Sequence, residues 1–194
     1  MAARGTSMRF LRLALLASAL DVAAVATGAE IEGVRIDDRI SLGGRALVLN
    51  GAGIRSKLVV ELYVVALYVP KRANDVDAVF AAAPRRIQMT LLHTVPATEI
   101  IDALLDTMAD NTSAAELAAV KPQTDRLVAL IRPFREVKKG DVVTLDFVNG
   151  ATELRWNGRL RGRIPGAAFN RALTRIWLGP KPVQVDLKQK LLGG

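Results

Sequence analysis

The sequence predicts an α+β domain in which helices cover one face of an antiparallel sheet. Three observations support this fold class. Strand patterns dominate the chain up to residue 93, helical apolar stripes follow over residues 97–134, and residues 142–178 hold a three-strand meander and a helix. This order of strands, helices, meander and helix is typical of α+β proteins, in which sheet and helices are segregated.

Composition limits the kinds of site that this chain can build. The 194 residues are 51% hydrophobic and 24% charged, which suits one domain with a proper core. The absence of cysteine excludes disulfides and thiol chemistry, and the single histidine, His93, excludes a His-rich metal site. The net charge is +8, but no basic motif carries interleaved aromatic residues, so we do not expect nucleic acid binding. We expect no cofactor either.

Residues 1–26 have the pattern of a secretory signal peptide. Arg4, Arg9 and Arg12 form a basic region, Leu13–Leu20 is a short apolar region, and Ala24–Ala26 supplies small residues for cleavage. The alternative is an amphipathic N-terminal helix. The signal peptide predicts a periplasmic or secreted protein with its folded domain over residues 30–194. No later segment is long enough to span a bilayer, so we expect no transmembrane segment in the mature chain.

The first strands lead to a central one. Residues 31–36 and 46–49 are predicted strands, and a turn at Gly51-Ala52-Gly53 precedes the stretch Leu58–Val69. Both alternating sets of side chains in that stretch are largely apolar, which indicates a strand covered on both faces. If the strand runs unbroken further back, one face also carries a polar cluster, either a site or a solvated strand end: Arg55, Lys57, Glu61 and Tyr63.

The middle of the chain turns helical after one more strand. Residues 76–82 are expected to form one or two helical turns and residues 86–93 a strand. Pro96 suits the first position of a helix, and apolar residues then recur at intervals of three and four residues, namely Ile100, Ile101, Leu104, Leu105 and Met108. Ser113 begins a capping box for a second short helix, and Thr124 is expected to cap a third that Pro133 ends.

The last part of the chain predicts a meander and two helices. Asn149-Gly150 is a two-residue hairpin signal between strands 142–148 and 151–156. The next strand is residues 159–164. A two-residue turn at Asn157-Gly158 would put its arginines on the apolar face of Leu154 and Trp156. We therefore predict a three-residue loop with a Gly bulge that brings Leu160 and Ile164 inward. A helix over residues 165–178 stops at Gly179-Pro180, and residues 185–192 form a short final helix.

No catalytic constellation follows from the residues alone. Gly51-Ala52-Gly53 lacks the third glycine of a dinucleotide fingerprint. His93 is more simply a packed or exposed histidine, and Trp177 a core residue. The arginines between residues 155 and 163 are most simply a solvated sheet face, and a phosphate or lipid-headgroup site is the alternative. Glu61 could act as a base, but an ion pair with Arg55 or Lys57 on the same face explains it as well. The residues by themselves indicate an exported α+β domain, with an apolar pocket as one option.

Two segments resemble the chalcone isomerase-like family, in particular its exported bacterial branch: LNGAGIRSKLVVELYVVALYVP and NGRLRGRIPGAAFNRALTRIWLGPKPVQVDLKQKLLG. The similarity runs from about residue 42 to residue 193, and between the two blocks it rests on pattern alone. The resemblance implies an open-faced β-sandwich, a long curved antiparallel sheet with a helical layer on one face. It also implies a ligand cleft between the sheet and the helices.

The resemblance also implies where a ligand would bind. In the plant enzymes of the family an arginine after the GxG turn holds the substrate, and Arg55 matches it. The other catalytic positions have changed residue type and fall on Tyr63, Thr98, Ile101, Leu105 and Ile176. Non-catalytic members bind fatty acids through the same arginine, so the expected function is binding of a fatty acid or similar apolar carboxylate. The alternatives are an isomerase or lyase that acts by intramolecular addition, and a ligandless structural or interaction domain.

Overall fold

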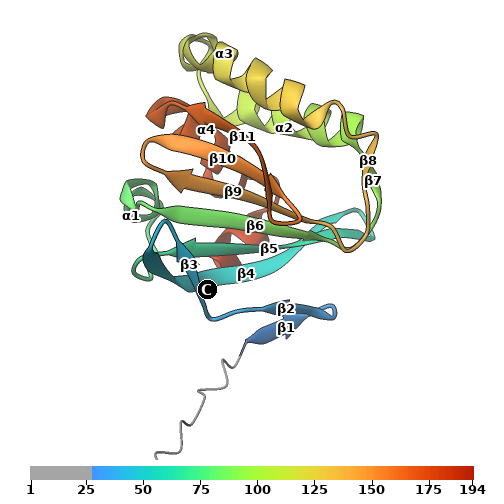
Figure 1. Ribbon diagram of the computed structural model, residues 1–194, viewed down its shortest axis with the longest axis vertical. Coiled ribbons are helices and arrows are strands. Elements are labelled where there is room, and N and C mark those ends of the chain that lie inside the picture. The colour runs from blue at the N-terminus through green and yellow to red at the C-terminus, as the bar shows by residue number, and fades with distance from the viewer. Residues whose placement is uncertain (1–27) are drawn as a thin grey trace, which may run out of the picture.

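A computed structural model describes residues 28–194, so the expected signal peptide lies outside the described residues. The architecture is a seven-stranded antiparallel sheet in the order β11-β10-β9-β6-β5-β4-β3, with helices packed on it (Figure 1). The strands of this sheet are β3 (Arg39–Leu42), β4 (Arg45–Lys57), β5 (Val60–Val69), β6 (Arg85–Leu91), β9 (Val142–Val148), β10 (Ala151–Trp156) and β11 (Arg159–Pro165). The α+β prediction and the curled antiparallel sheet of the predicted open-faced sandwich are confirmed.

Helices and short hairpins complete the domain. The helices are α1 (Val76–Ala81), α2 (Ala97–Asn111), α3 (Ala114–Ile131), α4 (Ala167–Leu178) and α5 (Val185–Leu191). The two-stranded sheets pair β1 (Ala29–Ile31) with β2 (Val34–Ile36), and β7 (Val95–Pro96) with β8 (Glu136–Val137). Figure 1 shows α2 and α3 stacked beyond the β11 edge and β1-β2 at the opposite end. Within residues 28–194, no helix combines the length and apolar character needed to cross a membrane.

The central strand is buried on both faces, as its sequence predicts. Val65 and Leu67 belong to the main core between the sheet and the helices, while Val64 and Tyr68 belong to a second core on the other face. Strand β3 and the β1-β2 hairpin supply the residues that cover this second core. Strand β5 therefore fixes which residues of its neighbours face the helices.

The expected start of the central strand is wrong. Lys57 pairs with Val60, so Leu58 and Val59 form the turn of a hairpin between β4 and β5. Arg55 consequently belongs to the preceding strand, not to an unbroken extension of β5. A two-residue turn without Gly, Asn or Asp looks in the sequence like a continuing apolar strand.

The predicted turn at Gly51-Ala52-Gly53 is also wrong, since these residues lie inside β4. The glycines are needed there because α5 lies against the strand. A Cβ on Gly51 would come within 2.0 Å of the Lys190 carbonyl oxygen, and one on Gly53 within 2.9 Å of Leu187 Cδ1. The two sequence blocks that carry the family resemblance therefore meet at the β4–α5 contact.

The helical region forms fewer helices than expected. Ser113 makes the predicted capping box with Glu116, but α3 then continues through Pro122 and Thr124 as one helix. Thr124 does not cap a helix, because its hydroxyl donates to the Val120 carbonyl one turn earlier (3.1 Å). Packing of the α3 apolar face on the core outweighs the backbone donor that Pro122 lacks.

The predicted bulge exists but lies inside the strand. Trp156 pairs with Arg159 across a two-residue turn, and the register shifts between Leu154 and Arg155, which leaves Arg161 as the extra residue. Ile164 is buried, as predicted, but Leu160 is 50% exposed, so its predicted inward position is wrong. The bulge lies one step beyond Leu160 and therefore does not turn its side chain inward.

Candidate functional site

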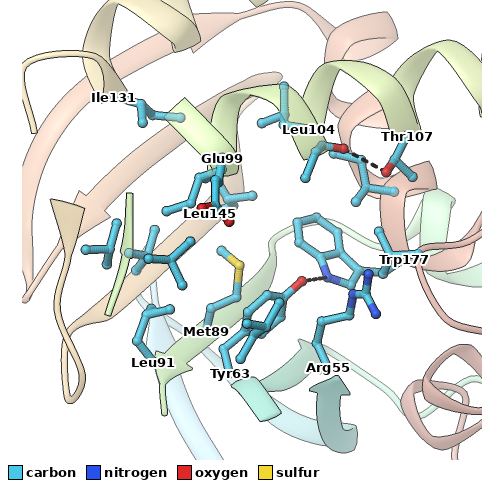
Figure 2. A pocket seen from close by; sticks show the side chains of 18 of the residues that line it. Arg55, Tyr63, Met89, Leu91, Glu99, Leu104, Thr107, Ile131, Leu145 and Trp177 are labelled. Carbon is cyan, nitrogen blue, oxygen red and sulfur yellow. Dashed lines mark hydrogen bonds between the residues drawn. The ribbon is translucent and has the colours of Figure 1, made fainter. Parts of the chain in front are cut away.

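A cavity of about 400 Å³ lies between the sheet and the helices (Figure 2). Strands β5, β6, β9 and β10 form its floor, and helices α2, α3 and α4 form much of its wall. Its lining is mainly aliphatic and aromatic, and includes Met89, Leu91, Leu104, Ile131, Leu145, Leu154, Trp156 and Ile176. Cavities of this size and character commonly hold small apolar molecules.

The β4–β5 hairpin brings Arg55 and Tyr63 to the same side of the sheet. The two residues are direct partners in the antiparallel register. Side chains at opposed positions of neighbouring strands project from the same face, so both reach the cavity. Figure 2 shows Arg55 and Tyr63 side by side below Trp177. The sequence therefore predicted the right neighbours, although through a strand path that the structure does not follow.

Tyr63 presents a polar group inside the apolar wall. Its hydroxyl oxygen accepts a hydrogen bond from Nε1 of Trp177 at 3.2 Å (Figure 2). Burial raises the pKa of the Tyr63 phenol, while the Trp177 hydrogen bond and the Arg55 charge oppose that rise. The phenol therefore stays protonated at neutral pH, and within the described part of the chain no acceptor takes its proton. Tyr63 can donate that proton to a ligand oxygen.

Arg55 is half-buried and is held mainly by neutral groups. Its Nη1 donates to the Ser56 carbonyl and to Oε1 of Gln184, the latter at 3.4 Å. Gln184 is itself fixed at the start of α5, because its side chain accepts from Ser56 N (2.9 Å) and donates to the Ile54 carbonyl (3.3 Å). Within residues 28–194 no carboxylate forms an ion pair with Arg55, so the alternative Arg55–Glu61 pair does not form.

Five charged residues are part of the cavity lining. Arg55, Lys57 and Lys181 contribute three cations, and Glu99 and Asp110 of α2 contribute two carboxylates. The lining therefore has a small positive excess, which favours an anionic group on a bound molecule. Residues 28–194 contain no cluster of three or more His, Asp or Glu side chains that could hold a metal ion.

Comparison with known proteins shows the family of this chain. The profile described as chalcone isomerase-like matches residues 28–193. The chain belongs to the chalcone isomerase-like family. Among solved structures, a fatty-acid-binding protein of Arabidopsis thaliana matches with a TM-score of 0.63 at 11% identity, over 82% of this chain and 92% of that one. At that identity the likeness shows the fold alone. No curated protein matches the sequence.

The structure divides the residues that the family resemblance singled out. Arg55, Tyr63 and Ile176 line the cavity of this chalcone isomerase-like chain, whereas Thr98, Ile101 and Leu105 do not. Thr98 and Leu105 lie on exposed parts of α2, and Ile101 is buried in the core beneath the helix. Positional matching to the family places these three residues on the wrong sides of the helix.

Other α2 residues take their place. Glu99, Ile100, Ala103, Leu104, Thr107 and Asp110 face the cavity. The Thr107 hydroxyl is already used, since it donates to the Ala103 carbonyl at 2.7 Å. Ile100, Leu104 and Thr107 are three and four residues apart, so they lie on one face of the helix, beside the face of the core residues Ile101 and Met108. The predicted stripe contained both faces and could not separate them.

Trp177 and Met89 are cavity residues that the sequence did not mark. Trp177 was expected in the core, and it is buried, yet it also lines the cavity and its Nε1–H donates to the Tyr63 hydroxyl. Met89 was assigned only to a strand, although its thioether lies beneath the cavity (Figure 2). His93 lies outside the site, exposed and with Nδ1 2.7 Å from the Glu61 carbonyl oxygen.

Proposed function

We propose that this chalcone isomerase-like protein binds a fatty acid or similar apolar carboxylate in its sheet–helix cavity and does not catalyse ring closure. One observation carries the proposal. A half-buried arginine without a carboxylate partner lies at the edge of a cavity of about 400 Å³ whose lining is mainly apolar. An apolar space with one charged group that sets orientation is the usual form of a site for such a ligand.

The chemistry of the site suits a carboxylate. The planar guanidinium of Arg55 can donate to both carboxylate oxygens, and the Tyr63 hydroxyl can add a further donor. An acyl chain would then lie over Met89 and Leu145 toward Ile131. The printed description of the Arabidopsis neighbour as a fatty-acid-binding protein agrees with this proposal.

The two alternatives fit these residues less well. A ligandless structural domain predicts a filled cleft, whereas the space between sheet and helices is a cavity of about 400 Å³. An isomerase needs donors that stabilise charge developing on a substrate carbonyl. Ile101 and Leu105, at the positions where the plant enzymes carry Lys and Asn, have no such donor and lie outside the cavity.

Titration of the protein and its Arg55→Ala variant with a long-chain fatty acid tests the proposal. Loss of a hydrogen bond to a charged group is expected to weaken binding by about 1.5–3 kcal/mol, roughly tenfold to a hundredfold in Kd. Thermal stability should barely change, because the Arg55 contacts are with polar neutral groups at the edge of the sheet. Arg159→Ala, an exposed arginine outside the cavity, is the matched control and should bind like the wild type. Equal affinities for all three proteins, or no binding by any, would remove Arg55 from a ligand site.

We also propose that the protein is exported and acts in the periplasm or outside the cell, as a member of the exported bacterial branch. The basic, apolar and small-residue regions within residues 1–26 support this proposal. N-terminal sequencing of protein expressed in a Gram-negative host should begin between Thr27 and Glu30. An intact Met1 on protein recovered from the cytoplasm would contradict export.

A further inference from the structure

The tip of the β4–β5 hairpin exposes large aliphatic side chains. Leu58 and Val59 are each 96% exposed, and the adjoining Val60 is 40% exposed. Figure 1 shows this hairpin reaching the edge of the molecule, at the same end as β7 and β8. Adjacent aliphatic residues that are almost wholly exposed gain nothing from the protein core, so their identity needs another reason.

The backbone of the turn does not provide that reason. Each of the other two-residue hairpin turns in the described chain contains glycine with a positive φ, namely Glu32-Gly33, Gly43-Gly44, Asn149-Gly150 and Asn157-Gly158. Leu58 adopts a φ of 56° at a position where glycine or asparagine fits at lower cost. The chain thus has Leu-Val where its own other hairpins carry a turn-forming pair.

The charged residues near the tip favour one kind of binding partner. Lys57 is exposed beside the aliphatic pair, and it lines the cavity together with Arg55 and Leu62 of the same hairpin. Lys181, also exposed, adds a cation to that lining, which also holds Glu99 and Asp110 of α2, while Glu61 is the acidic residue of the hairpin. Protruding aliphatic side chains beside cations suit the interface of an anionic bilayer, where the side chains enter the acyl region and the cations meet headgroups.

We propose that Leu58 and Val59 insert into an anionic lipid surface and hold the protein with its cavity edge against the headgroups. A protein partner fits the tip less well, because the two side chains project from a turn and form no groove or flat apolar face. The inference goes beyond fatty-acid binding and does not depend on it, since a bilayer can hold the tip whether or not the cavity is occupied.

Co-sedimentation with vesicles of equal parts phosphatidylglycerol and phosphatidylcholine tests this inference. The Leu58→Asn, Val59→Gly double variant is the sharpest probe, because it installs the pair that this chain uses twice elsewhere and should fold at least as stably. We expect it to bind vesicles at least tenfold more weakly than the wild type. Leu160→Asn changes another exposed aliphatic residue, away from the tip, and should bind like the wild type.

A second comparison addresses the charge. Lys57→Gln and added salt should each weaken binding to the mixed vesicles, and pure phosphatidylcholine vesicles should bind the wild type less. Failure of the wild type to sediment with the mixed vesicles, or equal sedimentation of the double variant, overturns the inference. Self-association of the wild type that the double variant loses, without vesicle binding, would assign the tip to a second copy and also overturn it. A fatty-acid titration of the double variant, expected to match the wild type, reports separately on the cavity.

Discussion

The contact between Gly51 and α5 makes a strong prediction about Gly51→Ala. The added Cβ would lie 2.0 Å from the Lys190 carbonyl oxygen and 2.9 Å from both Cα and the carbonyl carbon of Leu191. All three are backbone atoms, so no side-chain rotation can relieve the overlap. The last turn of α5 must move away from β4, or β4 must bend.

The magnitude follows from that displacement. Overpacking in a well-packed interior costs about 1–3 kcal/mol, and a clash with backbone belongs at the upper end of that range. Movement of α5 also stretches the hydrogen bond from Asn50 Nδ2 to the Leu191 carbonyl (2.7 Å), which adds about 1 kcal/mol. We therefore expect Gly51→Ala to lower the free energy of unfolding by about 3–4 kcal/mol.

Gly53→Ala is the matched control. Its Cβ would meet side-chain carbons, Leu187 Cδ1 at 2.9 Å and Lys190 Cδ at 3.0 Å. These atoms can shift by a few tenths of an ångström, so the cost should be about 1 kcal/mol. Urea unfolding of the wild type and the two variants would give the three free energies, and the Tm of Gly51→Ala should fall by about 6–16 °C. If Gly51→Ala unfolds like the wild type, or Gly53→Ala is the less stable variant, the close approach of α5 to β4 is refuted.

Three further predictions concern stability and activity. Asp146→Ala should cost about 3 kcal/mol in urea unfolding, because the fully buried carboxylate pairs with Arg86 and with Arg155 (3.2 Å), and unchanged stability would show that these pairs contribute little. Burial raises the pKa of Tyr68 to about 12, so between pH of about 10 and 12 the unfolded chain loses a proton that the folded protein keeps, and stability should fall by about 2–3 kcal/mol as pH rises. The free energy of unfolding of Tyr68→Phe should fall less steeply than that of the wild type over this pH range. The same slope for both proteins would contradict the assignment to Tyr68. When the protein is mixed with a chalcone, the chalcone absorbance should fall no faster than it does in buffer alone. A faster fall would establish the isomerase alternative.

Local sequence patterns determined much of the fold. Asn149-Gly150 specified its hairpin, and Ser113 with Glu116 specified the start of α3. Two-sided apolar alternation identified β5 as the covered central strand. These features depend on residues within a few positions of one another, so the sequence alone contains the physical information.

Tertiary structure decided the features that depend on contacts between distant segments. Gly51 looks like a turn residue until α5 is seen against β4, and Leu58-Val59 looks like strand until Lys57 pairs with Val60. On α2, apolar residues at intervals of three and four positions form a wide stripe. Which part of that stripe faces the core and which the cavity depends on where the sheet and α4 lie.

The candidate site shows the same division. The sequence pattern and family resemblance selected Arg55 and Tyr63, but their proximity arises from cross-strand pairing in a hairpin that the sequence did not reveal. The partners that fix them, Gln184 and Trp177, come from the far end of the chain. Residue types are set by the sequence alone, whereas a site needs side chains more than a hundred residues apart to converge, and only the packing of α4 and α5 on the sheet brings these together.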